Sequence, residues 1–177
     1  HGISTGSLFL IVGIVYERRH TRSIAEYGGL SKVMPVYAAI FLVMTMSSIG
    51  LPTLNGFIGE VLILQGVFVV SKFWAFIAAS GIVLGAAYML WLYQRTMFGD
   101  ITNPKNENLP DLSAREIWTF VPLLVLAVWI GLYPKPFLDR LETSVDNVMS
   151  RVNSDYTPRF ATTIDEDEVG PLRGGAR

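Results

Sequence analysis

A single carboxylate, Glu60, stands inside a long apolar stretch and is the residue best suited to carry chemistry. It is the only charged residue between Pro35 and Val70. Carboxylates within a membrane are costly, so they face a protein cavity or a partner and mark proton or ion pathways. Burial disfavours the charged form, which would let Glu60 exchange a proton near pH 7. We therefore predict that Glu60 carries protons. The alternative is a solvated glutamate near the far membrane face.

The second candidate is His1, whose imidazole titrates near neutrality and can pass protons. About 16 residues of helix, roughly 24 Å, separate it from the first basic loop, which would place it within the membrane and past the midplane. Taken alone, His1 is more simply interpreted as a histidine held by packing, or as a terminal residue without a role.

A predicted helix break lies shortly before Glu60. One straight helix over residues 35–70 would be about 54 Å long, nearly twice the hydrocarbon core of a bilayer. Gly50 and Pro52 fall in its middle, and both residue types interrupt helices. Unwound backbone at membrane depth is tolerated only where it is buried in protein or lines a wet cavity. We predict one discontinuous transmembrane helix over 35–70, unwound at residues 50–55. A hairpin of two short spans is the alternative.

The composition is that of a membrane protein. Hydrophobic residues make up 51% of the 177 residues and charged residues 16%, against about 25% charged residues in soluble domains. The net charge of −1 gives no bulk attraction to nucleic acid. Cysteine is absent and there are two histidines, which argues against disulfides and a protein-ligated metal centre. We expect no nucleic-acid partner and neither a metal nor a cofactor site in this chain.

The apolar segments predict the order of the membrane elements. We expect residues 1–17 to form the end of a transmembrane helix, and residues 73–95 and 117–133 to form two further spans. Residues 18–34, a basic loop with a short surface helix, and the loop 99–116 connect them. Seven Lys and Arg residues lie in or beside these two loops, against Lys72 alone in the third. The positive-inside rule therefore places both loops in the cytoplasm and favours the single broken span over the hairpin.

The two ends of the chain differ in character. The apolar run after His1 starts abruptly, so we expect a fragment whose N-terminal portion is missing. Ser113 and Glu116 form a predicted capping box at the start of the last span. Apolar residues recur at helical spacing through residues 137–152 among charged ones, which predicts an amphipathic surface helix. Residues 153–177 are polar, charged and rich in Gly and Pro, which predicts a disordered tail.

Several short motifs, taken together, resemble one known family. In order they are His1-Gly2-Ile3-Ser4 with Leu8-Phe9-Leu10, Tyr16-Glu17-Arg18-Arg19-His20-Thr21-Arg22, Tyr27-Gly28-Gly29-Leu30, Met34-Pro35, Gly50-Leu51-Pro52 with Asn55-Gly56-Phe57-Ile58-Gly59-Glu60, Tyr93-Gln94-Arg95 with Phe98-Gly99, and Asp111-Leu112-Ser113-Ala114-Arg115-Glu116. They resemble the eleventh helix through the start of the fourteenth in the M-chain family of NADH:quinone oxidoreductase. The resemblance covers about residues 1–140 and is specific as an ordered set.

The resemblance implies a fold of fourteen transmembrane helices with two inverted five-helix repeats, each containing a broken helix. This chain would hold the C-terminal part: the end of the second repeat and the last two helices. It implies that Glu60 is the terminal proton-carrying acid of the subunit's channel and that His1 belongs to a central hydrophilic axis. One departure is Thr53, because relatives often have Gly directly after the Pro. Its hydroxyl could bond backbone freed by the break.

The sequence thus predicts an all-α membrane protein, a transmembrane bundle with one discontinuous helix. We expect it to translocate protons as an integral, multi-pass subunit of an NADH:quinone oxidoreductase in a bacterial inner (plasma) membrane. Flavin and iron–sulfur clusters would lie in partner subunits, since the chain carries no motif for them. Neighbouring antiporter-like subunits and lipid are the expected contacts. The alternatives are a subunit of a multisubunit sodium/proton antiporter, and a passive scaffold in which Glu60 is structural.

Overall fold

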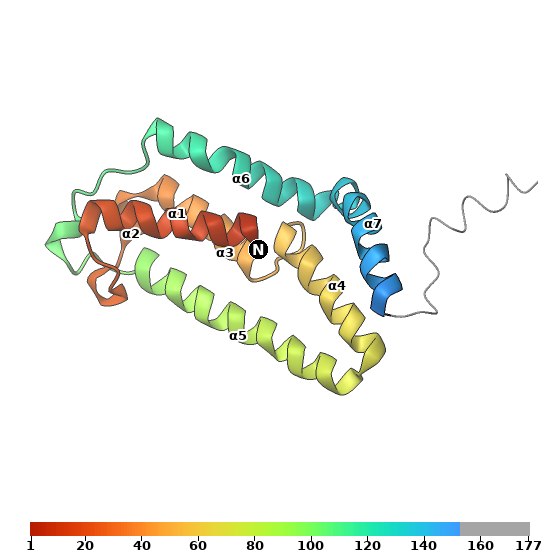
Figure 1. Ribbon diagram of the computed structural model, residues 1–177. Helices are drawn as coiled ribbons and strands as arrows, with labels where there is room; N and C mark the ends of the chain where they lie inside the picture. Colours follow the sequence, from red (N-terminus) through yellow and green to blue (C-terminus); the bar gives the residue numbers. More distant parts are fainter. Residues whose placement is uncertain (153–177) are drawn as a thin grey trace, which may run out of the picture. The chain divides into compact units, whose positions relative to one another are not determined.

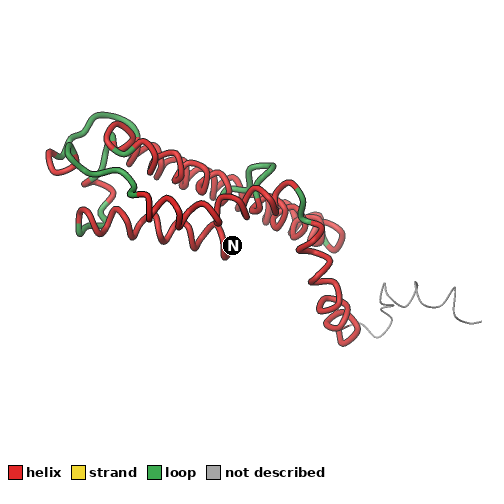
Figure 2. Tube along the Cα trace, turned by 90° about the horizontal axis from the view of Figure 1, so that it is seen from above, coloured by secondary structure: helices red, strands yellow, loops and turns green. Residues whose placement is uncertain are grey.

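The computed structural model describes residues 1–152, and within that range the secondary structure is entirely helical (Figures 1 and 2). The chain divides into two compact units, the first being His1–Pro134 and the second beginning at Lys135. The first unit contains, in order, α1 (Gly2–Arg19), the short 3-10 helix η1 (Ile24–Glu26), α2 (Leu30–Val33), α3 (Pro35–Ser48), α4 (Asn55–Val70), α5 (Lys72–Met97), the 3-10 helix η2 (Pro104–Asn106) and α6 (Ala114–Leu132). The described part of the second unit is α7 (Lys135–Val152).

The core of the first unit lies where α1, α3, α5 and α6 meet. Its largest fully buried apolar side chains are Ile11, Leu30, Met34, Met44, Met97 and Phe120. The Tyr37 hydroxyl on α3 donates to the Ile11 carbonyl of α1 over 3.0 Å, and the Tyr93 hydroxyl on α5 donates to the Ala38 carbonyl over 3.0 Å. Each tyrosine thus buries its ring in the core and still bonds its polar end, as buried tyrosines usually do.

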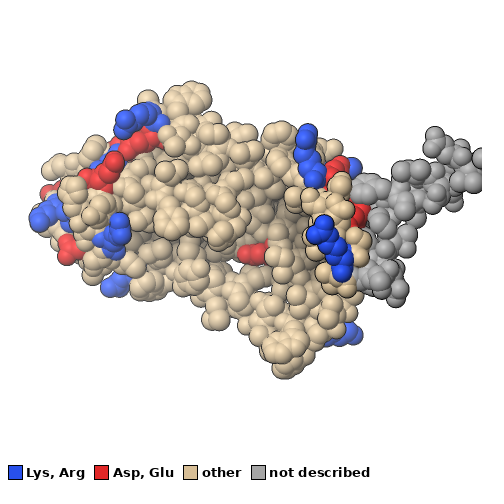
Figure 3. All heavy atoms as spheres, in the orientation of Figure 1, with Lys and Arg blue, Asp and Glu red and all other residues tan. Residues whose placement is uncertain are grey.

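Two helices of the described residues, α5 and α6, are long and apolar enough to cross a membrane by length and composition. Both carry large hydrophobic side chains on their outer surfaces, such as Phe76 and Val83 on α5 and Trp118 on α6. Most charged atoms of the first unit gather at the end that holds its two basic loops, and the surface along the helices is largely uncharged (Figure 3). An apolar outer surface of this kind is suited to lipid or to packing against further apolar helices.

The discontinuous helix is confirmed. α3 ends at Ser48 and α4 begins at Asn55, so the helical ladder is interrupted from Ile49 to Leu54. Gly50 adopts a positive φ of 76°, a conformation that glycine enters without the steric cost of a side chain. Pro52 then lies within the unwound stretch, where it removes no helical hydrogen bond.

The two basic loops meet at the same end of the first unit. The Gly29 amide donates to the Phe98 carbonyl over 3.0 Å, and the Lys32 ammonium pairs with the Asp100 carboxylate at 2.8 Å. The hydrogen bond from Lys32 also holds the pKa of Asp100 below its usual value. In Figure 1, α3 and α4 accordingly continue in one general direction and α5 returns beside them. A hairpin of α3 and α4 would have separated these loops.

The first loop contains two short helical segments in place of the one short surface helix expected within residues 18–34. η1 ends at Glu26 and α2 starts at Leu30. Gly29 has φ +66°, and a Cβ there would lie 3.0 Å from the Gly99 carbonyl oxygen and the Asp100 backbone. Leu30 is buried in the core and Tyr27 is buried nearby. These apolar residues of the loop thus pack against the bundle.

α7 coincides closely with the amphipathic segment expected at 137–152. Its charged residues alternate with apolar ones that remain exposed, including Leu141, Val145 and Val148. The Lys135 ammonium pairs with the Asp139 carboxylate one turn later at 2.7 Å. Its location on a membrane surface stays a prediction. The tail expected over 153–177 lies outside the described residues.

Membrane sidedness leads to a labelling prediction. Single cysteines replacing the exposed residues Ser23 and Asn108 should react with an impermeant thiol reagent from the cytoplasmic face, and one replacing Lys72 from the opposite face. The full-length subunit would be used in a version otherwise free of cysteine, in right-side-out and inside-out vesicles. Labelling of Ser23 and Asn108 positions from opposite faces would contradict the single broken span.

Candidate functional site

The helix break is held by a few specific hydrogen bonds. The Ser47 hydroxyl, at the end of α3, donates to the Asn55 side-chain oxygen at the start of α4 over 2.5 Å. The Leu51 amide donates to the Met46 carbonyl over 3.0 Å, and the Leu54 amide to the Leu51 carbonyl over 3.1 Å. These bonds replace part of the lost helical ladder, which is a requirement for unwound backbone away from water.

Close helix packing also shapes the break. A Cβ added to Gly56 of α4 would overlap the Ser47 carbonyl oxygen, and one added to Gly131 of α6 would overlap the Thr53 carbonyl oxygen. Both obstacles are backbone atoms, which cannot rotate away. The two glycines therefore let α3, α4 and α6 approach the unwound segment more closely than any other residue would permit.

Glu60 lies one to two turns into α4 and its side chain reaches back to the break. A Cβ built on Gly50 would lie 2.8 Å from the carboxyl carbon of Glu60 and would overlap one of its oxygens. The carboxyl thus rests against the unwound backbone rather than extending along the outer surface of α4. Glu60 is half-buried, and within residues 1–152 no hydrogen bond from another residue holds its carboxyl.

Thr53 occupies a position whose backbone conformation favours glycine. Its φ is +83°, in the left-handed region that a β-branched residue rarely enters. Glycine, expected in relatives at this position, would adopt that conformation without strain. The Thr53 side chain makes no hydrogen bond within residues 1–152, so the expectation that its hydroxyl bonds backbone freed by the break is wrong. The side chain is exposed and the carbonyl faces Gly131.

His1 occupies the N-cap position of α1 without a side-chain capping hydrogen bond, and its Nδ1 lies 3.3 Å from the Thr5 hydroxyl. Because α1 and α3 pack side by side in opposite directions, the start of α1 lies at the same end as the last turns of α3 (Figure 1). In the described part of the chain no hydrogen bond joins His1 to Glu60. The structure therefore brings Glu60 into contact with the break and leaves His1 as a separate polar group at the start of α1. No group of three or more metal-binding side chains occurs among the described residues.

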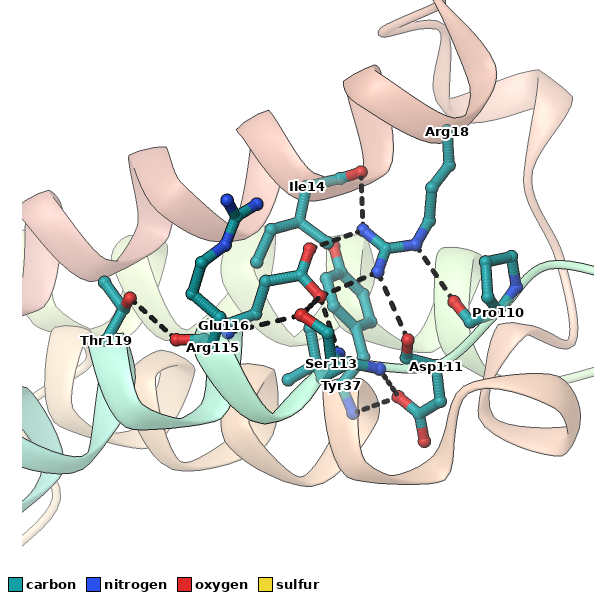
Figure 4. A network of polar contacts seen from close by, with 10 residues as sticks. Ile14, Arg18, Tyr37, Pro110, Asp111, Ser113, Arg115, Glu116 and Thr119 are labelled. Atoms are coloured by element: carbon teal, nitrogen blue, oxygen red, sulfur yellow. Dashed lines mark hydrogen bonds and ion pairs between the residues drawn. The ribbon is translucent and has the colours of Figure 1, made fainter.

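A polar network that sequence reasoning missed fixes the opposite, loop end of the bundle (Figure 4). Arg18 of α1 contacts both carboxylate oxygens of Glu116 on α6 at 3.0 Å, and donates to the carbonyls of Pro110 and Asp111. The Asp111 carboxylate accepts from the first amides of α3, those of Val36 at 2.8 Å and Tyr37 at 3.0 Å. Three helices are thereby tied together through one arginine and two acids.

The capping box predicted at the start of α6 is confirmed and belongs to this network. The Glu116 carboxylate accepts from the Ser113 amide over 2.7 Å, and the Ser113 side chain accepts from the Glu116 amide. The local sequence signal identified the cap. It could not identify Arg18 as the ionic partner of Glu116, because 98 residues separate the two in the chain.

Comparisons with known proteins agree with this architecture. A family model described as NADH:quinone oxidoreductase/Mrp antiporter, transmembrane, matches residues 1–85. NADH-quinone oxidoreductase subunit M of Rickettsia prowazekii is 49% identical over 149 residues, covering 84% of this chain and 30% of the relative. Subunit M of Rhodobacter capsulatus is 43% identical, covering 88% and 30%. NADH-ubiquinone oxidoreductase chain 4 of Arabidopsis thaliana is 45% identical, covering 84% and 30%.

A solved structure agrees as well. A chain of respiratory complex I from Thermus thermophilus with bound NADH matches with a TM-score of 0.67 and 36% identity, covering 75% of this chain and 28% of that one. The fold, the broken helix and these matches are those of part of an antiporter-like integral membrane protein. Residues 1–85 thus match the NADH:quinone oxidoreductase/Mrp antiporter family, and over most of the chain the similarity is to subunit M, or chain 4. It spans about 30% of the length of these curated relatives.

Proposed function

We propose that the chain is part of a proton-translocating membrane subunit of an NADH:quinone oxidoreductase, and that Glu60 takes up and releases the translocated proton. The observation that carries the proposal is the contact between the Glu60 carboxyl and the unwound backbone at Gly50. A titratable group at a helix break inside a membrane bundle is the arrangement by which transporters expose an ion site to alternate sides.

In this mechanism Glu60 receives a proton from the side of the bundle where His1 lies and releases it toward the far face. A neutral imidazole can accept a proton at one nitrogen and donate from the other, which suits His1 to the relay. Conformational or electrostatic changes in neighbouring subunits would alter the proton affinity of Glu60 and so drive the transfer.

The chemistry that drives the pump is assigned to partner subunits. Within the proposal, flavin and iron–sulfur clusters lie in those partners, neighbouring antiporter-like subunits pack against this one, and this chain holds no cofactor. A bacterial inner membrane is the proposed location, supported by the similarity to two bacterial M subunits. The same similarity favours the oxidoreductase over a multisubunit sodium/proton antiporter.

The test is Glu60→Gln in the full-length subunit, assembled with its partners in inverted membrane vesicles. Glutamine keeps the size and hydrogen-bonding capacity of the side chain but cannot exchange a proton. Redox-driven proton pumping, normalised to assembled complex, should fall by about tenfold or more, as expected when a proton-transfer group is removed. Coupled NADH–quinone turnover should fall with it.

Glu60→Asp is the matched variant, because it keeps a carboxyl within about 1.5 Å of the original place. It should retain a good part of the pumping. If Glu60 had only a structural role, the Gln variant would be tolerated better than the Asp variant, since a neutral amide costs less to bury than a charge. Normal pumping by a fully assembled Gln variant would exclude Glu60 as the proton carrier.

A further inference from the structure

We propose that Gly50 is a positioning residue for Glu60: the missing side chain at Gly50 leaves the space in which the carboxyl rests on the break. The inference rests on the proposed function of Glu60 and assigns a second residue to the same site. Gly50 itself has no side chain that could transfer a proton, so its contribution is to determine where the Glu60 carboxyl lies.

The contact is specific to this glycine. Among the glycines of residues 1–152, Gly50 alone has a carboxyl group in the space that a Cβ would occupy. The others face backbone atoms, neutral side-chain atoms or open space. Gly59, one residue before Glu60 on α4, has nothing within 4 Å. The gap that receives the carboxyl is therefore provided by the break and not by the glycine content of α4.

Gly50 could be required only because glycine adopts a positive φ without strain. This backbone role has to be separated from the positioning of the Glu60 carboxyl. Gly99 offers the comparison, because its φ is +91° and a Cβ there would meet nothing within 4 Å. An alanine at either position takes on a similar backbone cost, because both positions have a φ in the left-handed region. Only at Gly50 does the new methyl group also displace a carboxyl.

The obstacle at Gly50 is the far end of a flexible side chain, in contrast to the backbone atoms that face Gly56 and Gly131. Alanine at position 50 should therefore rotate the Glu60 carboxyl away and leave the fold intact. The displaced carboxyl would lie among the apolar side chains of α4, away from the polar backbone of the break. Misplacement of a reacting group by about 1 Å can cost as much as 100-fold in rate.

The experiment compares Gly50→Ala, Gly99→Ala and Glu60→Gln in the full-length subunit, in vesicles, per assembled complex. Pumping should fall at least about fivefold in Gly50→Ala and less than about twofold in Gly99→Ala. Gly50→Asn is a second variant, because Asn tolerates a positive φ but still fills the space. It should lose pumping to a similar extent even if the alanine variant assembles poorly.

Rescue distinguishes positioning from a backbone effect. Adding Glu60→Asp to Gly50→Ala shortens the side chain by one methylene and relieves the overlap, so the double variant should pump better than Gly50→Ala alone. The pH profile of turnover should also move in Gly50→Ala and not in Gly99→Ala.

Equal pumping by assembled Gly50→Asn and Gly99→Ala, with Glu60→Gln impaired, would overturn the positioning role and leave the relay standing. A loss in Gly50→Ala without rescue and without a change in pH profile would likewise assign Gly50 to backbone geometry alone. Normal pumping by Glu60→Gln would overturn the relay itself.

Discussion

The full-length subunit carrying Arg18→Leu is expected not to assemble stably in the membrane. Arg18 and Glu116 are largely buried, with 13% and 14% of their side chains exposed. Removing one partner leaves the other as a buried, unpaired charge, which costs about 3–5 kcal/mol. The same substitution removes the donors to the Pro110 and Asp111 carbonyls (Figure 4). The measurement is the amount of subunit in the purified complex and the temperature at which the complex dissociates.

Arg115→Leu is the matched control for Arg18→Leu. It removes the same charge from the same end of the bundle, but Arg115 is exposed and its side chain has no ion pair within residues 1–152. It should change the dissociation temperature little. Replacing Arg18 and Glu116 together should cost less than replacing Arg18 alone, because no lone buried charge remains. Unimpaired assembly of Arg18→Leu would contradict a stabilising role of the Arg18–Glu116 ion pair between α1 and α6.

The second large effect is expected for Gly131→Ala. The added methyl group would overlap the Thr53 carbonyl and lie 2.5 Å from the Leu54 Cα, so α6 must move away from the break. Overpacking of this kind costs about 1–3 kcal/mol, and more where the backbone itself is the obstacle. We expect reduced assembly and a lower dissociation temperature, together with weaker pumping, because Thr53 and Leu54 belong to the unwound segment that Glu60 contacts.

Gly85→Ala on α5 is the control for Gly131→Ala. A Cβ at Gly85 meets nothing within 4 Å. Alanine is favoured over glycine within a helix by about 1 kcal/mol, so this variant should be neutral or slightly stabilising. If the two alanine variants behave alike, the close approach of α6 to the break is not important for stability.

The broken helix and the candidate acid were predictable from sequence because both depend on local signals. Gly50 and Pro52 interrupt a stretch too long for one span, and Glu60 is the only charge in it. The start of α6 was predictable for the same reason, since a capping box involves residues three apart.

The contact between Glu60 and Gly50 could not be predicted in the same way. It depends on how α4 is rotated and tilted relative to the break, and that is decided by the packing of Gly56 on Ser47 and of Gly131 on Thr53. No spacing rule connects these residues. The role of Gly50 beyond its backbone conformation thus emerges only from the assembled bundle.

Loop polarity was a poor guide to exposure. Asn106 lies in a polar loop, yet it is fully buried and accepts a hydrogen bond from Arg19 over 2.6 Å. Its amide donates to the Glu26 carbonyl over 2.9 Å. From the sequence, a buried polar residue whose hydrogen bonds are satisfied cannot be distinguished from a solvated polar residue. Pairing between loops 80 or more residues apart is what the sequence alone did not reveal.

The interrupted helix also has a consequence for how the protein enters the membrane. α3 has 14 residues and α4 has 16, which correspond to about 21 Å and 24 Å, whereas the hydrocarbon core is about 30 Å thick. Neither segment can cross the bilayer alone, and the unwound residues between them cannot face lipid. Insertion of this stretch must therefore coincide with its packing against α1 and α6, so that biogenesis and tertiary folding become one step for this part of the chain.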